Sequence, residues 1–80
     1  MLAVALTGCT ATRTTQEKTA GWSNNRIYSE ARDERSSGGY DRAVELYNVL
    51  EGRAAGTTLA QQAQLEKAYT QYQNAEYEEA

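Results

Sequence analysis

Apolar side chains recur at intervals of three and four residues over much of the chain beyond residue 22, which is the spacing of one face of an α-helix. In the segment 40–51 the residues on this face are Ala43, Val44, Tyr47 and Leu50. In the segment 59–74 the residues with the same spacing are Leu65, Ala68, Tyr69 and Tyr72. The pattern predicts an all-α fold in which each of these faces is the inner side of its helix.

The first two helices are predicted from residues that start and stop helices. Ser23 or Asn24 is a suitable N-cap for a helix that runs to Arg35 or Ser36. The pair Gly38-Gly39 ends this helix, and a second helix follows over residues 40–51.

A third helix is predicted over residues 59–74, after a loop that contains Gly52 and Gly56. Thr58, with Gln61 three residues later, fits a capping box at its start. A fourth helix is predicted to begin near Tyr77.

The helical segments show a weak internal repeat. Shifting the chain by 37 residues pairs small or aromatic residues: Ala31 with Ala68, Tyr40 with Tyr77, and Ala43 with Ala80. Small residues at helix crossings and an aromatic residue at the start of the second helix resemble the tetratricopeptide pattern. A generic helical hairpin would use similar residue types without a fixed period, so we favour the repeat. The predicted fold is all-α, with tetratricopeptide-like hairpins over residues 22–80 that form about one and a half units of an α-solenoid.

The first residues have the character of an export signal. Met1 to Leu6 are apolar and far too few to span a bilayer, so residues 1–8 are interpreted as part of a signal peptide. Leu6-Thr7-Gly8-Cys9 resembles the bacterial lipobox, and this resemblance implies cleavage after Gly8 and acylation of Cys9 with diacylglyceryl and palmitate chains. The alternative, a buried structural Cys9, is disfavoured because the residue lies between an apolar and a polar stretch.

Residues 9–21 lack periodicity and are predicted to be a disordered, flexible tether between lipid and repeats.

Composition narrows the functional classes. The chain has 8 basic and 11 acidic residues and a net charge of −3, which argues against a nucleic-acid partner. It has no His and one Cys, and no catalytic constellation or metal site is discernible, so we expect neither enzymatic activity nor a cofactor.

Stacked helix pairs form a groove that can receive a peptide, and helical position and chemistry select the candidate contacts. These candidates are Tyr28, Arg32, Arg35, Tyr69 and Tyr72. At Arg35 we favour a snorkelling side chain, whose aliphatic stem packs on the protein while its charged head stays in water, over a groove contact.

Three segments, together with the lipobox and the Trp22-Ser23 pair, carry a resemblance to a known family: residues 27–31 (IYSEA), 39–43 (GYDRA) and 60–65 (AQQAQL). They resemble the N-terminal region of the BamD family, the tetratricopeptide lipoproteins of the outer-membrane β-barrel assembly machinery. The resemblance implies a scaffold without catalysis, lipid-anchored at the periplasmic face of the outer membrane, with unfolded barrel proteins and assembly subunits as partners. It also implies that the chain is the N-terminal third or so of a longer protein.

The segment 53–57 departs from the family pattern, because it lacks the aromatic residues and Pro found there, and any role of those residues is not carried over. Two other classes remain open. One is a different lipid-anchored periplasmic repeat scaffold, for cell-wall or envelope maintenance. The other is the adaptor region of an envelope enzyme.

Overall fold

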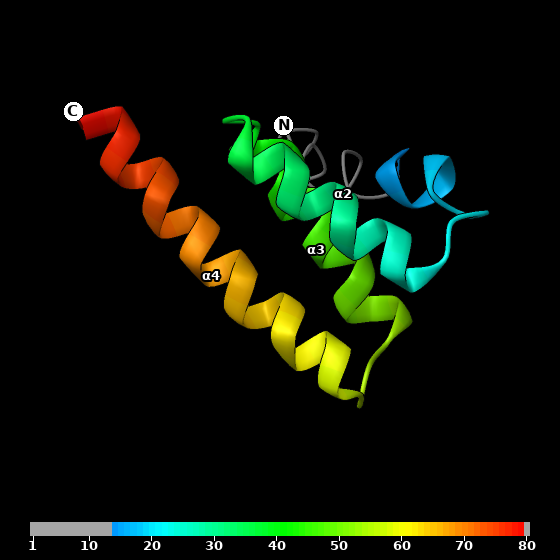
Figure 1. Ribbon diagram of the computed structural model, residues 1–80. Coiled ribbons are helices and arrows are strands. Elements are labelled where there is room, and N and C mark those ends of the chain that lie inside the picture. Colours follow the sequence, from blue (N-terminus) through cyan, green and yellow to red (C-terminus); the bar gives the residue numbers. More distant parts are fainter. Residues whose placement is uncertain (1–13, 80) are drawn as a thin grey trace, which may run out of the picture.

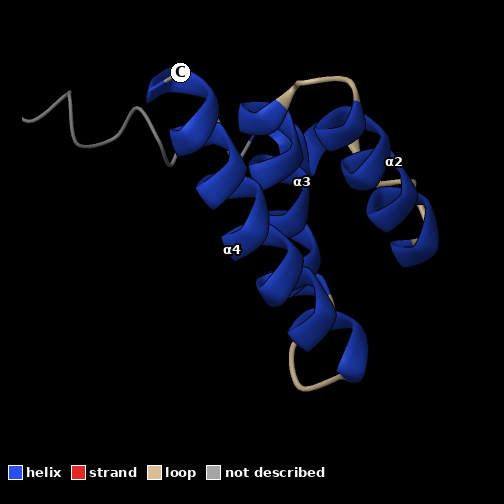
Figure 2. Cartoon of the chain, turned by 60° about the vertical axis from the view of Figure 1, so that its left-hand side comes forward, coloured by secondary structure: helices blue, strands red, loops and turns tan. Residues whose placement is uncertain are grey.

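The computed structural model describes residues 14–79, so the predictions for the signal segment, for Cys9 and for Ala80 lie outside the described residues. The described elements are a short helix over residues 14–18 and three longer helices. These are α2 (Asn24–Ser36), α3 (Tyr40–Arg53) and α4 (Thr58–Glu79). Helix α3 lies between α2 and α4 and packs against both (Figures 1 and 2). The prediction of an all-α fold is confirmed, and the described part of the chain contains no strand.

The boundaries of α2 follow from local chemistry. The side chain of Ser23 accepts a hydrogen bond from the backbone N–H of Arg26, which satisfies one of the free donors at the helix start. At the other end Gly38 adopts a φ of 91°, a left-handed conformation that suits glycine. The Gly39 N–H then donates to the carbonyl of Glu34, which closes the helix at the predicted place.

The core is built mostly from α3. Its residues are Ile27 and Ala31 of α2, Ala43, Leu46, Tyr47, Val49 and Leu50 of α3, and Ala63 of α4. The sequence pattern predicted Ala43, Tyr47 and Leu50 correctly, whereas Val44 is half-buried. Leu46 and Val49 were not predicted, because a helix covered on two sides needs an apolar arc wider than one stripe.

The inner face predicted for the third helix is wrong. In α4 the side turned toward α3 carries Leu59, Ala63 and Thr70, and Ala63 and Thr70 are fully buried. The predicted inner residues are exposed: Leu65 by 66%, Tyr69 by 53% and Tyr72 by 59%, as is Ala68. The small side chains of Ala63 and Thr70 let the α4 backbone approach α3 closely. This close approach, rather than the hydrophobicity of the side chains, explains which face of α4 packs against α3.

Two further details of α4 differ from the prediction. Its N-cap is Thr57 rather than Thr58, since the Thr57 hydroxyl accepts from the Ala60 N–H at 3.3 Å. The helix also continues without a break to Glu79, because residues 73–76 (QNAE) contain no Gly or Pro to end it. Tyr77 therefore lies in α4, where its ring is 6.1 Å from that of Tyr40, and does not begin a fourth helix.

The folded body begins earlier than residue 22. Residues 14–18 are helical, and Thr15 and Thr19 are buried. The Thr15 hydroxyl donates to the Glu45 carboxylate at 2.7 Å, and the Arg53 guanidinium donates to the Thr19 carbonyl at 3.2 Å. The prediction of a flexible tether is therefore wrong for residues 14–21. Hydropathy missed this segment because its buried side chains are threonines whose hydroxyls are hydrogen-bonded.

None of the helices within residues 14–79 is both long enough and apolar enough to cross a bilayer.

Candidate functional site

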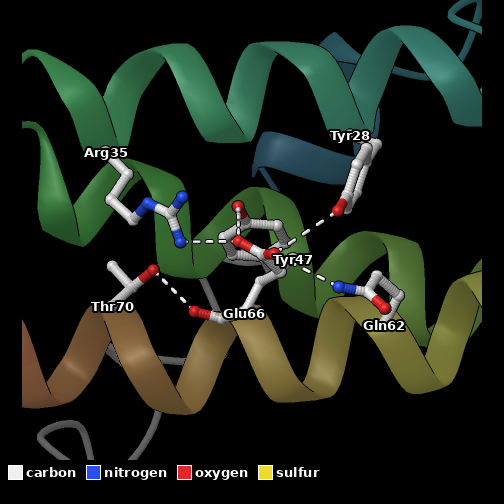
Figure 3. A network of polar contacts seen from close by, with 6 residues as sticks. All are labelled: Tyr28, Arg35, Tyr47, Gln62, Glu66 and Thr70. Carbon is white, nitrogen blue, oxygen red and sulfur yellow. Dashed lines mark hydrogen bonds and ion pairs between the residues drawn. The ribbon is translucent and has the colours of Figure 1, made fainter.

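A single carboxylate joins the three long helices (Figure 3). Glu66 of α4 receives the Arg35 guanidinium of α2 at 2.5 Å. The hydroxyls of Tyr28 and Tyr47 donate to the same carboxylate at 3.5 Å and 3.4 Å, and Gln62 donates its side-chain amide at 3.2 Å. The network therefore connects α2 to α4 across the surface of α3.

The environment of this network makes its contacts strong. The side chains of Arg35 and Glu66 are 16% and 17% exposed, so their charges are largely removed from water. A carboxylate in such a place is costly unless donors satisfy it, and here four side chains do so. Glu66 is consequently a structural carboxylate that fixes the relative positions of α2 and α4.

The hydroxyl of Tyr47 lies in the same buried network, and its pKa is shifted as a result. Burial raises the pKa of Tyr47 to about 12, and the negative charge of Glu66 adds to this effect. Both causes disfavour the phenolate, so Tyr47 is a hydrogen-bond donor at neutral pH.

The structure brings four of the five predicted contact residues together. The Arg32 guanidinium lies 5.8 Å from the ring centroid of Tyr28, and the Arg35 guanidinium lies 5.5 Å from that of Tyr69. The fifth, Tyr72, lies three residues beyond Tyr69 on α4 and is exposed. The Arg35 guanidinium is ion-paired with Glu66 of α4, so the snorkelling interpretation favoured from the sequence is wrong.

The sequence did not identify three residues of this network: Gln62, Glu66 and Tyr47, the last of which was assigned only to the core. Hydrophobic periodicity could not identify Glu66, because it does not register a largely buried carboxylate. The available signal was its spacing, because Glu66 lies three residues after Ala63 and four before Thr70, on the packed side of α4. A charged residue in that position requires a partner of opposite charge on the opposing helices.

We define the α2–α4 surface by its exposed or partly exposed side chains: Tyr28, Arg32, Arg35, Leu65, Tyr69 and Tyr72. It combines aromatic faces, one aliphatic side chain and guanidinium groups. Such a surface can stack on apolar side chains of a peptide and bind carboxylate or carbonyl oxygens. Among residues 14–79, no three His, Cys, Asp or Glu side chains converge to hold a metal ion.

The architecture, a helical hairpin followed by a further helix on the same central helix, defines the class of helical-repeat proteins. Comparison with known families agrees, since a tetratricopeptide repeat profile matches residues 15–80, and the chain belongs to the tetratricopeptide repeat family.

Among curated relatives, the chain is similar over 99% of its length to outer membrane protein assembly factor BamD of Neisseria meningitidis serogroup B, with 43% identity. It is 42% identical to the protein of the same name from Neisseria gonorrhoeae, again over 99% of this chain. The chain spans 31% of the length of each of these relatives. The family resemblance inferred from the sequence is thereby confirmed. No solved structure shows a significant match.

Proposed function

We propose that this chain is part of a non-enzymatic scaffold for the assembly of outer-membrane proteins, and that its α2–α4 surface binds segments of unfolded barrel proteins. The main observation behind this proposal is that Leu65, Tyr69 and Tyr72 are exposed along one side of α4, beside Arg35. Large apolar side chains gathered on one exposed face are characteristic of protein-binding surfaces. The name of the curated relatives, outer membrane protein assembly factor, supports the process in which this surface would act.

The contacts of the surface suit a peptide ligand. Tyr and Arg are enriched among the residues that contribute most to binding at protein interfaces, and Tyr offers a large contact area at a low cost in side-chain entropy. Arg35 is already held by Glu66 and by the ring of Tyr69, so part of the ordering cost is met before the ligand arrives. The resemblance to these relatives supports other assembly subunits as further partners.

A binding experiment tests this proposal. A labelled peptide from the C-terminal strand of an outer-membrane barrel protein is titrated with the chain, and binding is followed by fluorescence anisotropy. Tyr69→Ala and Tyr72→Ala are each expected to weaken binding about ten-fold, as truncation of a contact aromatic does. Tyr77→Ala is the matched control, since Tyr77 is a 71% exposed tyrosine of the same helix that lies beside Tyr40. Unchanged affinity in both test variants would contradict the assignment of the surface.

The second part of the proposal is a lipid anchor on Cys9 that holds the protein at the periplasmic face of the outer membrane. The lipobox-like Leu6-Thr7-Gly8-Cys9 supports it, and several acyl chains are sufficient for stable anchoring. In the full-length protein, Cys9→Ser is expected to abolish incorporation of labelled palmitate and release of the signal peptide. Normal processing and membrane retention of that variant would rule out the anchor.

A further inference from the structure

Basic side chains gather around Trp22 at the start of the folded body. The Arg26 guanidinium lies 4.1 Å from the centroid of the Trp22 ring, which is a cation–π contact. Arg53, at the end of α3, donates to the Trp22 carbonyl at 2.8 Å and to the Thr19 carbonyl at 3.2 Å. Lys18 precedes Thr19 directly and is exposed. We call Lys18, Trp22, Arg26 and Arg53 the Trp22 end.

The Trp22 end is positive in a chain whose net charge is −3. Lys18, Arg26 and Arg53 are all exposed, whereas the ion pairs found within residues 14–79 join Arg35 to Glu66 and Lys67 to Glu51. Glu17 in the same turn as Lys18 and Glu30 one turn after Arg26 offset part of this charge, so the local excess is about one positive charge. Trp22 is half-buried, with part of its ring packed against the core. Tryptophan flanked by arginine and lysine is the combination that prefers the boundary between lipid headgroups and water.

The distance to the proposed anchor restricts where this end can lie. Five residue steps separate Cys9 from Thr14, the first described residue, and a fully extended chain covers at most about 18 Å over that stretch. The folded body measures 33 × 33 × 21 Å, so it is wider than the reach of its own tether. Lys18, the first residue of the Trp22 end, lies one helical turn after Thr14, so an anchor at Cys9 would hold this end near the bilayer.

We propose that the Trp22 end is a membrane-contact surface that docks on anionic phospholipid headgroups once Cys9 is anchored. The inference rests on the proposed lipid anchor. Three cations bind a charged bilayer weakly from solution, but a short tether raises their effective concentration at the surface to the millimolar range. Docking would fix the orientation of the repeats relative to the membrane, rather than leaving them to swing freely on the lipid.

The chain itself offers the probes for a test. Cys9 is its one cysteine and Trp22 its one tryptophan. The 80-residue chain is coupled through Cys9 to a maleimide phospholipid in vesicles of phosphatidylethanolamine, with or without phosphatidylglycerol. Both vesicle types contain a brominated phospholipid, which quenches tryptophan fluorescence at the headgroup boundary. Quenching of Trp22 is expected with phosphatidylglycerol and should decline as salt is added.

Two double variants of equal charge provide the comparison. Lys18→Gln/Arg26→Gln removes two cations from the Trp22 end and is expected to lower the docking equilibrium about thirty-fold. Arg32→Gln/Arg42→Gln removes two cations from elsewhere on α2 and α3 and should leave quenching unchanged. Arg53 is retained in both because it holds the segment 14–22 to α3.

The proposal is overturned if Trp22 of the coupled chain is not quenched, or if quenching is the same without phosphatidylglycerol. Equal losses in the two double variants would also overturn it, because they would show a general charge effect. Chemical coupling does not depend on processing in cells, so a Cys9 that proves unlipidated in vivo leaves this result readable and refutes the anchor separately.

Discussion

The guanidinium of Arg35 and the carboxylate of Glu66 form an ion pair of 2.5 Å that joins two helices lying on either side of α3. The two residues are 31 positions apart in the chain and are brought together by the packing of α2 and α4 on the same central helix. The pair therefore depends on the tertiary arrangement of all three helices, and its loss should weaken that arrangement.

Glu66→Ala is expected to lower the free energy of unfolding by about 2 kcal/mol, because it leaves Arg35 and two tyrosine hydroxyls without their acceptor. Urea denaturation measures this loss. The pairwise contribution follows from a double-mutant cycle with Arg35→Gln and Glu66→Gln, in which we expect a coupling of about 1 kcal/mol. Additive effects of the two substitutions would show that the ion pair does not contribute to stability.

The corrected face of α4 can be tested with two alanines of the same helix. Ala63 is fully buried, so Ala63→Leu should overpack the contact with α3 and cost about 1–3 kcal/mol. Ala68 is exposed, and Ala68→Leu should change stability by less than about 0.5 kcal/mol. Thermal melts of both variants measure the difference. If Ala68→Leu destabilised the protein more than Ala63→Leu, the inner face predicted from the sequence would be correct.

Gly39 lies against the end of α2. A Cβ at this position would displace the Glu34 carboxylate, which can move, and would lie 3.3 Å from the Glu34 carbonyl oxygen, which cannot easily do so, so Gly39→Ala should destabilise the protein by up to about 1 kcal/mol. Gly52 is the matched control, since it lies in the last turn of α3 and an added methyl group there would have no neighbour within 4 Å. Gly52→Ala should stabilise the protein by about 0.5–1 kcal/mol through higher helix propensity. If chemical denaturation shows both changes to be neutral, the close approach at Gly39 is not a constraint.

Tyr47 predicts a loss of stability at alkaline pH. Its pKa in the folded protein is about 12, against about 10 in the unfolded chain, so the neutral phenol is favoured by folding. This contribution is fully present below pH 10 and is lost as the pH rises from about 10 toward 12, because the unfolded chain then releases its proton first.

Urea melts at pH 9, 10 and 11 compare the protein with Tyr47→Phe. Stability of the parent chain should fall between pH 10 and 11 by about 1 kcal/mol more than that of the variant. Tyr77→Phe, at an exposed position, should behave like the parent. If the stability of Tyr47→Phe fell with pH as steeply as that of the parent chain, the raised pKa of Tyr47 would not be the cause of the loss.

Much of the local structure was predictable from the sequence because its causes are local. The Ser23 cap, the glycines after α2 and the three-and-four spacing in α3 each act within a few residues of the chain. The start of the folded body was not predictable in this way. Thr15 and Thr19 are buried because Glu45 and Arg53, some 30 residues later, lie beside them.

The sequence by itself determined that this chain forms amphipathic helices of the tetratricopeptide kind, where the first of them ends, and which family it resembles. The tertiary structure decided which side of α4 meets α3, and it did so through the small residues Ala63 and Thr70, whose size lets backbones approach. It also decided the role of Glu66, because a carboxylate becomes a connector only when donors from two other helices surround it. Helical periodicity identifies the apolar side chains, but contact between helices also depends on shape and charge at positions far apart in the chain.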